Sequence, residues 1–206
     1  MRSYRSLLAC LVLFVTLGLQ SCTAWTVVQQ AEPNPFVGQK AFAFQPLQIS
    51  SVPDVGTEPD KVANRDNDMA SMKPIFANTL KQAGRDAGLQ ISESGAPYTI
   101  RTDVTTLDLG SIWTGYSQVN VTVEIADASG KKLDVITIDQ RVDIDESGNS
   151  TTQTRGNTSV TTSGPGSVKE TIDTAKKLSS GNRIRIGAER VAKVVVDYLV
   201  ARTSGG

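Results

Sequence analysis

The chain of 206 residues contains no histidine. Without an imidazole, Ser-His-Asp and Cys-His nucleophilic sites, histidine general bases and the usual zinc sites are all excluded. An enzyme built from this chain would have to use carboxylates, lysine, tyrosine or serine, as paired-carboxylate glycosidases do. No catalytic pair stands out among the 21 scattered acidic residues. We therefore expect a protein that is not an enzyme and that carries no cofactor.

An excess of charge is missing as well, because 21 Lys and Arg residues balance 21 Asp and Glu residues. A protein that binds nucleic acid normally carries a basic stripe, so we expect no nucleic-acid partner. The same balance argues against strong attraction to anionic lipid headgroups. If this protein is held at a membrane, charge does not hold it there.

Cysteine occurs only at positions 10 and 22, and Cys22 directly follows a segment that has the form of an export signal. Arg2 and Arg5 precede an apolar run at 7–19, which is too short to span a bilayer and has the form of a secretory signal peptide. The run ends in Leu-Gln-Ser-Cys at 19–22, which resembles the bacterial lipobox. That resemblance implies a lipoprotein signal peptide at 1–21, cleavage before Cys22, and acylation of Cys22 with palmitate-type chains. The alternative is an ordinary signal peptide with an incidental thiol.

Acylation of Cys22 would fix the location of the protein. One acyl chain binds a membrane only reversibly, whereas three chains on one cysteine anchor a domain persistently. In lipoproteins, Asp after the cysteine retains the protein at the inner membrane, and here Thr23 follows. We therefore expect a lipid-anchored protein of the bacterial outer membrane that faces the periplasm. With Cys10 removed and Cys22 acylated, no thiol remains for a disulfide or a metal site.

Beyond the cysteine, we divide the chain into a lipidated tether and one domain. The segment 22–38 carries Pro33 and Pro35 without a clear period, which predicts a tether. Residues 39–202 have the length of one ordinary domain. Within them, 145–168 consist mostly of Ser, Thr, Gly and Asn. This Ser/Thr/Gly-rich excursion is either a solvated loop or a projecting polar hairpin.

Alternating apolar and polar residues predict strands at 98–105, 119–126 and 133–144. The turn residues at 127–131 join the last two, so an antiparallel hairpin is the clearest motif in the chain. A change of phase after Val135 predicts a bulge between Val135 and Ile136. Another bulge or bend is expected before Gly110.

An earlier strand is predicted at 40–49, where Pro46 would remove a ladder hydrogen bond and so favours the edge of a sheet. Apolar residues at helical spacing predict a helix at 68–87, preceded by a loop at 50–67 and stopped by Gly88. Pro74 suggests that this helix begins near Met72. The C-terminal part predicts either two helices or one kinked helix, with apolar stripes over 168–178 and 184–199.

These elements predict an α+β fold in which a mostly antiparallel sheet of about four strands has two or three helices packed on one face. The stretches FANTLKQAGRDAG, YTIRTDVTTLDLG and GAERVAKVVVDYLVAR, in this order, resemble small periplasm-facing lipoproteins of unknown function. The chain is more distantly similar to lipopolysaccharide-assembly and curli-secretion lipoproteins. The resemblance implies a structural or assembly partner in the cell envelope, and Cys22 is the only functional residue that it transfers.

Two further groups of residues are weaker site candidates. Trp113 and Tyr116 lie between two strands and form either a binding lip or a cover for the edge of the sheet. Asp143, Asp145 and Ser147 match the first half of a calcium-binding loop. The second half fails because Thr154 stands where a bidentate Glu is needed, so we expect no metal.

For the function, two hypotheses follow from the sequence. The first is an accessory or assembly protein that docks on an envelope complex through a sheet edge or through the polar hairpin. The second is a periplasm-facing module that binds a lipid or a glycan in an apolar pocket between sheet and helices.

Overall fold

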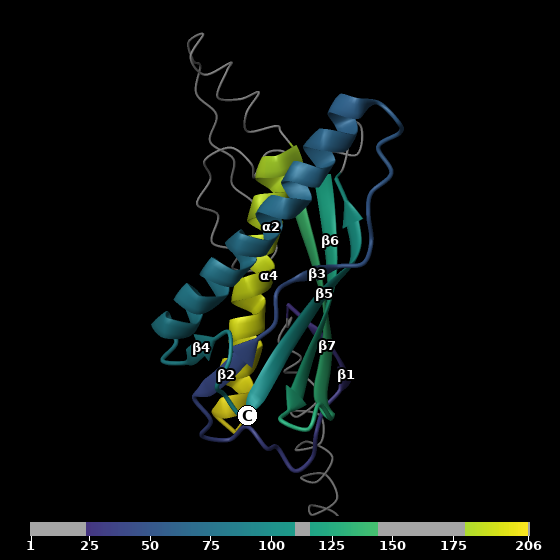
Figure 1. The fold of residues 1–206 in the computed structure, drawn as a ribbon. Helices are drawn as coiled ribbons and strands as arrows, with labels where there is room; N and C mark the ends of the chain where they lie inside the picture. The colour runs from purple at the N-terminus through teal and green to yellow at the C-terminus, as the bar shows by residue number, and fades with distance from the viewer. Residues whose placement is uncertain (1–23, 110–115, 144–179, 206) are drawn as a thin grey trace, which may run out of the picture.

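The computed structural model describes residues 24–109, 116–143 and 180–205 (Figure 1). Within these residues the chain forms seven strands and two helices. The elements, in chain order, are β1 (Thr26–Gln29), β2 (Ala41–Phe44), β3 (Gln48–Ile49), α2 (Pro59–Asp86), β4 (Gln90–Ser92), β5 (Tyr98–Asp108), β6 (Tyr116–Asp127), β7 (Lys132–Asp143) and α4 (Ser180–Thr203).

All seven strands belong to one mixed sheet with the order β1-β7-β6-β5-β2-β4, and β3 pairs with β5. The neighbours β1 and β7, β7 and β6, and β6 and β5 pair in antiparallel fashion. In contrast, β2 pairs in parallel with both β4 and β5, and β3 pairs in parallel with β5. The α+β class is confirmed, but the expected sheet of about four mostly antiparallel strands is wrong. The missed strands, β1 and β4, have four and three residues, which is too few for an alternating pattern to be recognised.

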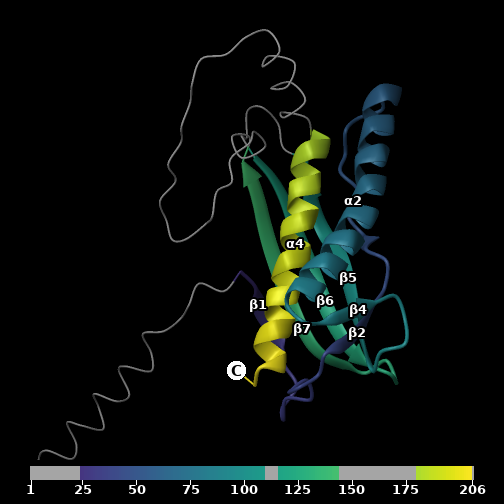
Figure 2. The same ribbon diagram turned by 90° about the vertical axis from the view of Figure 1, so that its left-hand side faces the viewer.

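Both described helices lie on the same face of the sheet, as expected (Figures 1 and 2). Helix α4 runs along the sheet between α2 and β7, and its apolar stripe is fully buried. That stripe meets the inward residues of β6, which alternate with outward polar ones as far as Ile125. The main buried side chains at this contact are Val119, Val121, Val123, Ile125, Ile184, Val191, Val195 and Leu199.

The predicted hairpin is confirmed by the regular pairing of β6 with β7 across a turn at 127–131. The bulge expected before Gly110 is also present, as a register shift between Val104 and Thr106 in β5. The bulge expected between Val135 and Ile136 is wrong, because Val135 pairs directly with Glu124 and Ile136 with Val123. The change of phase has another cause: Asp134 is buried in line with Ile136 and Ile138.

The first helix is longer than predicted. Helix α2 begins at Pro59, so the loop expected over 50–67 is wrong from that residue onward, and Pro74 lies inside the helix instead of near its start. Proline suits the first turn of a helix, where its missing N–H would have no partner. The predicted end is confirmed: α2 stops at Asp86 and Gly88 follows with a φ of 75°. The first turns of α2 are mostly polar, so they lack the apolar periodicity that predicts a helix.

The strand predicted at 40–49 is divided into β2 and β3, and Pro46 lies between them. The edge position is wrong for β2, which lies between β5 and β4, but it is confirmed for β3, which pairs only with β5. The two ends of the main strand order are β1 and β4.

The expected tether is wrong over 24–38. Thr26–Gln29 is β1, which pairs with β7, and Phe36 is completely buried in the core beside Phe42 and Tyr98. The proline residues in this segment therefore shape a packed connection and not a free linker.

Several predictions fall outside the described residues. They are the signal peptide at 1–21, Cys22, the Ser/Thr/Gly-rich excursion at 145–168 and the apolar stripe at 168–178. Neither of the helices that the structure describes combines the length and apolarity needed to cross a bilayer.

Candidate functional site

The candidate site is the uncovered sheet face, by which we mean the outward side chains of β5, β6 and β7. No described helix lies on this face (Figure 1). Its residues alternate with the core residues of the same strands, so the pleat that builds the core also builds this face. Its polar residues include Arg101, Asp103, Thr105, Gln118, Asn120, Thr122, Glu124, Thr137, Asp139 and Arg141.

The register aligns polar side chains in rows across the strands. Thr122 of β6 lies opposite Asp103 of β5 and opposite Thr137 of β7, and Thr137 lies opposite Thr26 of β1. Directly opposed residues point to the same face and lie within contact distance of each other. One row of three threonines and an aspartate therefore crosses four strands.

Hydrogen bonds hold several of these side chains in place. Gln118 donates from Nε2 to Asp139 Oδ1 at 3.1 Å and to Asn120 Oδ1 at 3.3 Å. Asp103 accepts from the Ser50 hydroxyl at 2.8 Å. Paired side chains lose less entropy when a partner binds, because their rotamers are already restricted.

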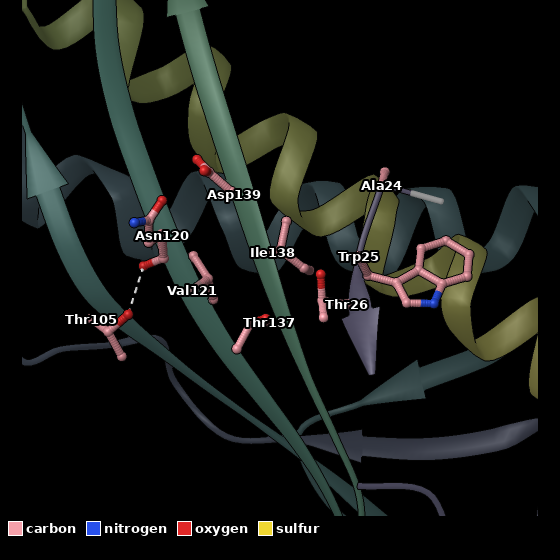
Figure 3. Close-up of a pocket in the computed structure, with 9 residues that line it drawn as sticks. All are labelled: Ala24, Trp25, Thr26, Thr105, Asn120, Val121, Thr137, Ile138 and Asp139. Carbon is pink, nitrogen blue, oxygen red and sulfur yellow. Dashed lines mark hydrogen bonds between the residues drawn. The ribbon is translucent and has the colours of Figure 1, made fainter. Parts of the chain in front are cut away.

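A hollow of about 450 Å³ opens on this face between β5 and the start of β1 (Figure 3). Thr105, Asn120, Thr137 and Asp139 supply its polar groups, and the Thr105 hydroxyl donates to the Asn120 backbone carbonyl at 3.3 Å. Figure 3 shows the Trp25 ring turned away from Asn120 and Asp139, and this ring meets Tyr198 edge-on with 5.6 Å between centroids.

A second hollow of about 400 Å³ adjoins the first, and Thr105 lines both. It lies between β5, β6 and the segment that contains Pro46 and Ser50, and it includes Arg101 and Glu124. The two hollows together make a shallow polar surface that can give and accept hydrogen bonds. In the part of the chain that the structure describes, no cluster of three or more Asp, Glu, Cys or His residues could hold a metal.

The residues predicted as sites from the sequence are partly described. Tyr116 lies opposite Asp143 at the ends of β6 and β7, and the structure brings both to Arg141. The Arg141 guanidinium lies 3.8 Å from the centre of the Tyr116 ring and donates to Asp143 Oδ1 at 2.9 Å. A positive charge therefore stands beside the first residue of the weak calcium candidate. Trp113, Asp145 and Ser147 lie outside the described residues, as Cys22 does.

The sequence did not predict a buried polar cluster of Asp134, Tyr198 and Arg202. Asp134 accepts from the Tyr198 hydroxyl at 2.5 Å, from Arg202 Nε at 2.8 Å and from the Ala31 backbone N–H at 2.8 Å. Arg202 also donates from Nη2 to the Ala31 carbonyl at 2.9 Å. The cluster joins the segment after β1 to β7 and to the end of α4.

Burial raises the pKa of Tyr198 well above its ordinary value, and the hydrogen bond to Asp134 acts in the same direction. Tyr198 therefore stays protonated and remains a donor. The signal in the sequence was Asp134 itself, which stands in phase with Ile136 and Ile138 on a buried face. Only a partner in another part of the chain makes such a position acceptable for a carboxylate.

Arg183 near the start of α4 is a second buried charge. Within the described ranges, its Nε and Nη1 atoms have no hydrogen-bond partner. Burial lowers the pKa of its guanidinium, and the charge of Asp108 opposes this effect. The group stays charged, because an arginine keeps its proton in proteins.

No family model matches this sequence, and no curated protein matches it. Solved structures with a similar arrangement of elements include a PelC dodecamer from Paraburkholderia phytofirmans, with 20% identity, a TM-score of 0.37 and coverage of 77% of this chain and 97% of that one. A Xanthomonas campestris protein of the family DUF330 has 10% identity, a TM-score of 0.43 and coverage of 86% and 93%.

A third similar structure is a minor lipoprotein from Acinetobacter baumannii, with 14% identity, a TM-score of 0.35 and coverage of 79% of this chain and 93% of that one. All three TM-scores are below 0.5. These similarities assign neither a family nor a function to the present chain.

Proposed function

We propose that this protein is a lipid-anchored, non-enzymatic component of the bacterial cell envelope, and that it docks on an envelope protein complex through its uncovered sheet face. The docking proposal is based on the uncovered sheet face. It spans the three longest strands, and no described helix covers it (Figure 1). An antiparallel sheet can leave one face in water, but this face also has aligned rows and preordered side chains.

The anchor is the second part of the proposal. The lipobox-like residues at 19–22 support acylation of Cys22, and Thr23 supports delivery to the outer membrane. The domain would then face the periplasm. The balanced charge of the chain is consistent with an anchor made of lipid rather than of basic residues.

The polar character of the face favours a partner with polar groups. Its cations and anions are partly paired with each other, as in the ion pair of Lys132 with Glu124 and that of Arg141 with Asp143. A partner would therefore be selected by hydrogen bonds and by shape more than by net charge.

A glycan is the second candidate ligand, because the hollow lined by Thr105, Asn120 and Asp139 offers hydroxyl, amide and carboxylate groups together. A lipid fits the structure less well. The apolar contact between sheet and helices is filled by side chains such as Phe76, Ile138 and Leu199, which are almost completely buried.

The proposal is tested by purifying the full-length protein from crosslinked envelopes and comparing two variants with the wild type. Thr137→Arg places a long charged side chain in the centre of the face, whereas Asn78→Arg places the same side chain on an exposed position of α2. We expect the wild type and Asn78→Arg to recover one stoichiometric protein complex. Thr137→Arg should recover at least tenfold less, at equal expression.

Other results would change the assignment. Recovery of a glycan without a protein partner would favour the second candidate. Turnover of a glycan by the purified protein would contradict the non-enzymatic proposal. For the anchor, Cys22→Ser should abolish palmitate labelling and release the protein from the membrane fraction. A Cys22→Ser product that stays labelled and membrane-bound would contradict acylation at this residue.

A further inference from the structure

Among the residues that the structure describes, no strand pairs with the outer edge of β1, and two of the four β1 residues are valines. Its sequence, Thr-Val-Val-Gln, has neither a charge nor a proline, and the side chains of Val27 and Val28 are 44% and 64% exposed. Edge strands in native proteins usually carry charges, prolines or a covering element, because free backbone groups attract other strands. A register shift between Val27 and Gln29 bends β1 but leaves both valines exposed. This edge is therefore suited to an environment that accepts apolar side chains.

The same strand lies very close to the expected anchor. Only Thr23 and Ala24 separate Cys22 from Trp25. An extended chain advances at most about 3.6 Å per residue, so the Cα atoms of Cys22 and Trp25 can be no more than about 11 Å apart. Acyl chains in the bilayer place Cys22 at the headgroup level, and the headgroup layer is itself several ångströms thick. Trp25 must then lie in this layer or directly above it.

The segment that follows Cys22 is fixed to the domain and cannot act as a spacer. The Trp25 ring meets Tyr198 of α4, and Ala31 is bound through both its N–H and its carbonyl by the Asp134 and Arg202 side chains. Asn34 donates to the Arg202 carbonyl at 2.8 Å. The body of the domain therefore starts at Trp25, and its orientation follows from that of β1.

We propose that Trp25, Val27 and Val28 form a membrane-contact edge that rests in the headgroup layer of the leaflet holding the Cys22 lipid. This inference depends on acylation of Cys22, which is part of the proposed function. Tryptophan is enriched at membrane interfaces, and valine side chains lose water there. Lipid headgroups also carry hydrogen-bonding groups that can pair with the free backbone of an edge strand. In every orientation of the domain, the two-residue connection keeps the start of β1 close to the membrane.

The test uses the full-length protein, processed in a bacterial host and reconstituted in vesicles of phosphatidylethanolamine and phosphatidylglycerol at about 3:1. A nitroxide label is placed on Val28→Cys, and on Gln90→Cys in β4 as the matched control, because Gln90 is exposed on the opposite edge strand. Collision rates with oxygen, which concentrates in lipid, and with a water-soluble nickel chelate then report the surroundings of each label. Val27→Cys provides a second position on β1.

We expect the ratio of oxygen to nickel collisions to be at least fivefold higher at positions 27 and 28 than at position 90. Intact mass identifies acylation in the same samples. Equal ratios at all three positions in an acylated protein would overturn the membrane-contact edge and leave the anchor standing. A label at position 28 that is shielded from both reagents would also overturn it, because a protein would then cover β1. An unacylated product would overturn both proposals.

Discussion

At the scale of single residues, the structure depends on a carboxylate that the sequence places where an apolar side chain is expected. Asp134 is fully buried, and Arg202 and Tyr198 of α4 supply its partners. A buried ion pair adds little net stability when compared with a well-packed apolar replacement. Loss of Arg202 is different, because the two remaining donors, the Tyr198 hydroxyl and the Ala31 N–H, do not neutralise the buried charge.

We therefore predict that Arg202→Leu lowers the free energy of unfolding by about 3–5 kcal/mol, because it leaves the Asp134 carboxylate without its cation. Arg185→Leu is the matched control on the same helix, since Arg185 pairs with Glu189 on the exposed side of α4. That exposed pair should contribute less than about 1 kcal/mol. Urea unfolding of the purified variants measures both values. Equal losses would contradict the role of the cluster.

Tyr198 makes a prediction about alkaline pH. Its pKa in the folded protein lies above the ordinary value of 10. Above about pH 10 the unfolded chain loses this proton while the folded protein keeps it, so the stability contributed by Tyr198 falls as pH rises. Tyr198→Phe should be less stable near neutral pH by about 1–3 kcal/mol, for the lost hydrogen bond to a buried charge.

The test is the slope of unfolding free energy against pH for the wild type and for Tyr198→Phe. We expect parallel curves between about pH 7 and 9 and a steeper fall for the wild type above about pH 10. Lysine and arginine titrate in both proteins and cancel in the comparison. Parallel curves over the whole range would contradict the raised pKa.

At the scale of elements, α2 approaches β4 closely at Gly84. A Cβ atom at this position would lie 2.6 Å from Ile91 Cδ1 and 2.8 Å from Ile91 Cγ1. Alanine would improve the helix propensity by about 1 kcal/mol, while overpacking costs about 1–3 kcal/mol. We predict that Gly84→Ala lowers the free energy of unfolding by about 1 kcal/mol.

A double-mutant cycle separates these two effects. In an Ile91→Ala background the clash is removed, so Gly84→Ala should become neutral or stabilising by up to about 1 kcal/mol. Thermal or urea unfolding of the four proteins measures the interaction. A Gly84→Ala effect of the same sign and size in both backgrounds would show that the contact with Ile91 does not limit the approach of α2.

The elements that the sequence predicted are those whose own pattern is complete. β5 and β6 alternate clearly, the turn between β6 and β7 is polar, and the apolar stripe over 184–199 marks α4. The short strands β1 and β4 depend on partners far along the chain, and their sequences carry no period. The polar first half of α2 also carries no apolar period from which a helix could be predicted.

The uncovered sheet face could likewise be predicted from the sequence only in part. Its residues could have been found from the sequence as the polar phase of the alternating strands. The alignment of Thr26 with Thr137 could not, because it depends on pairing between residues that are far apart in the sequence. The buried cluster at Asp134 was missed for the same reason, since its three side chains come from β7 and α4.

At the scale of the whole molecule, the two proposals are geometrically compatible. If the β1 edge rests on the leaflet, the sheet stands on its edge with respect to the membrane. The uncovered sheet face then points sideways, along the membrane surface, and α2 and α4 point in the opposite direction (Figures 1 and 2). A partner anchored in the same membrane could reach the face without displacing the lipid anchor.

The most direct measurement is site-specific photo-crosslinking in living cells. A photoreactive amino acid replaces Thr122 or Asp139 on the uncovered face of the full-length protein, and Asn78 on α2 serves as the control position. We expect a discrete protein adduct from positions 122 and 139, its loss in the Thr137→Arg background, and none from position 78. An adduct from position 78 with none from positions 122 and 139 would contradict docking through the sheet face.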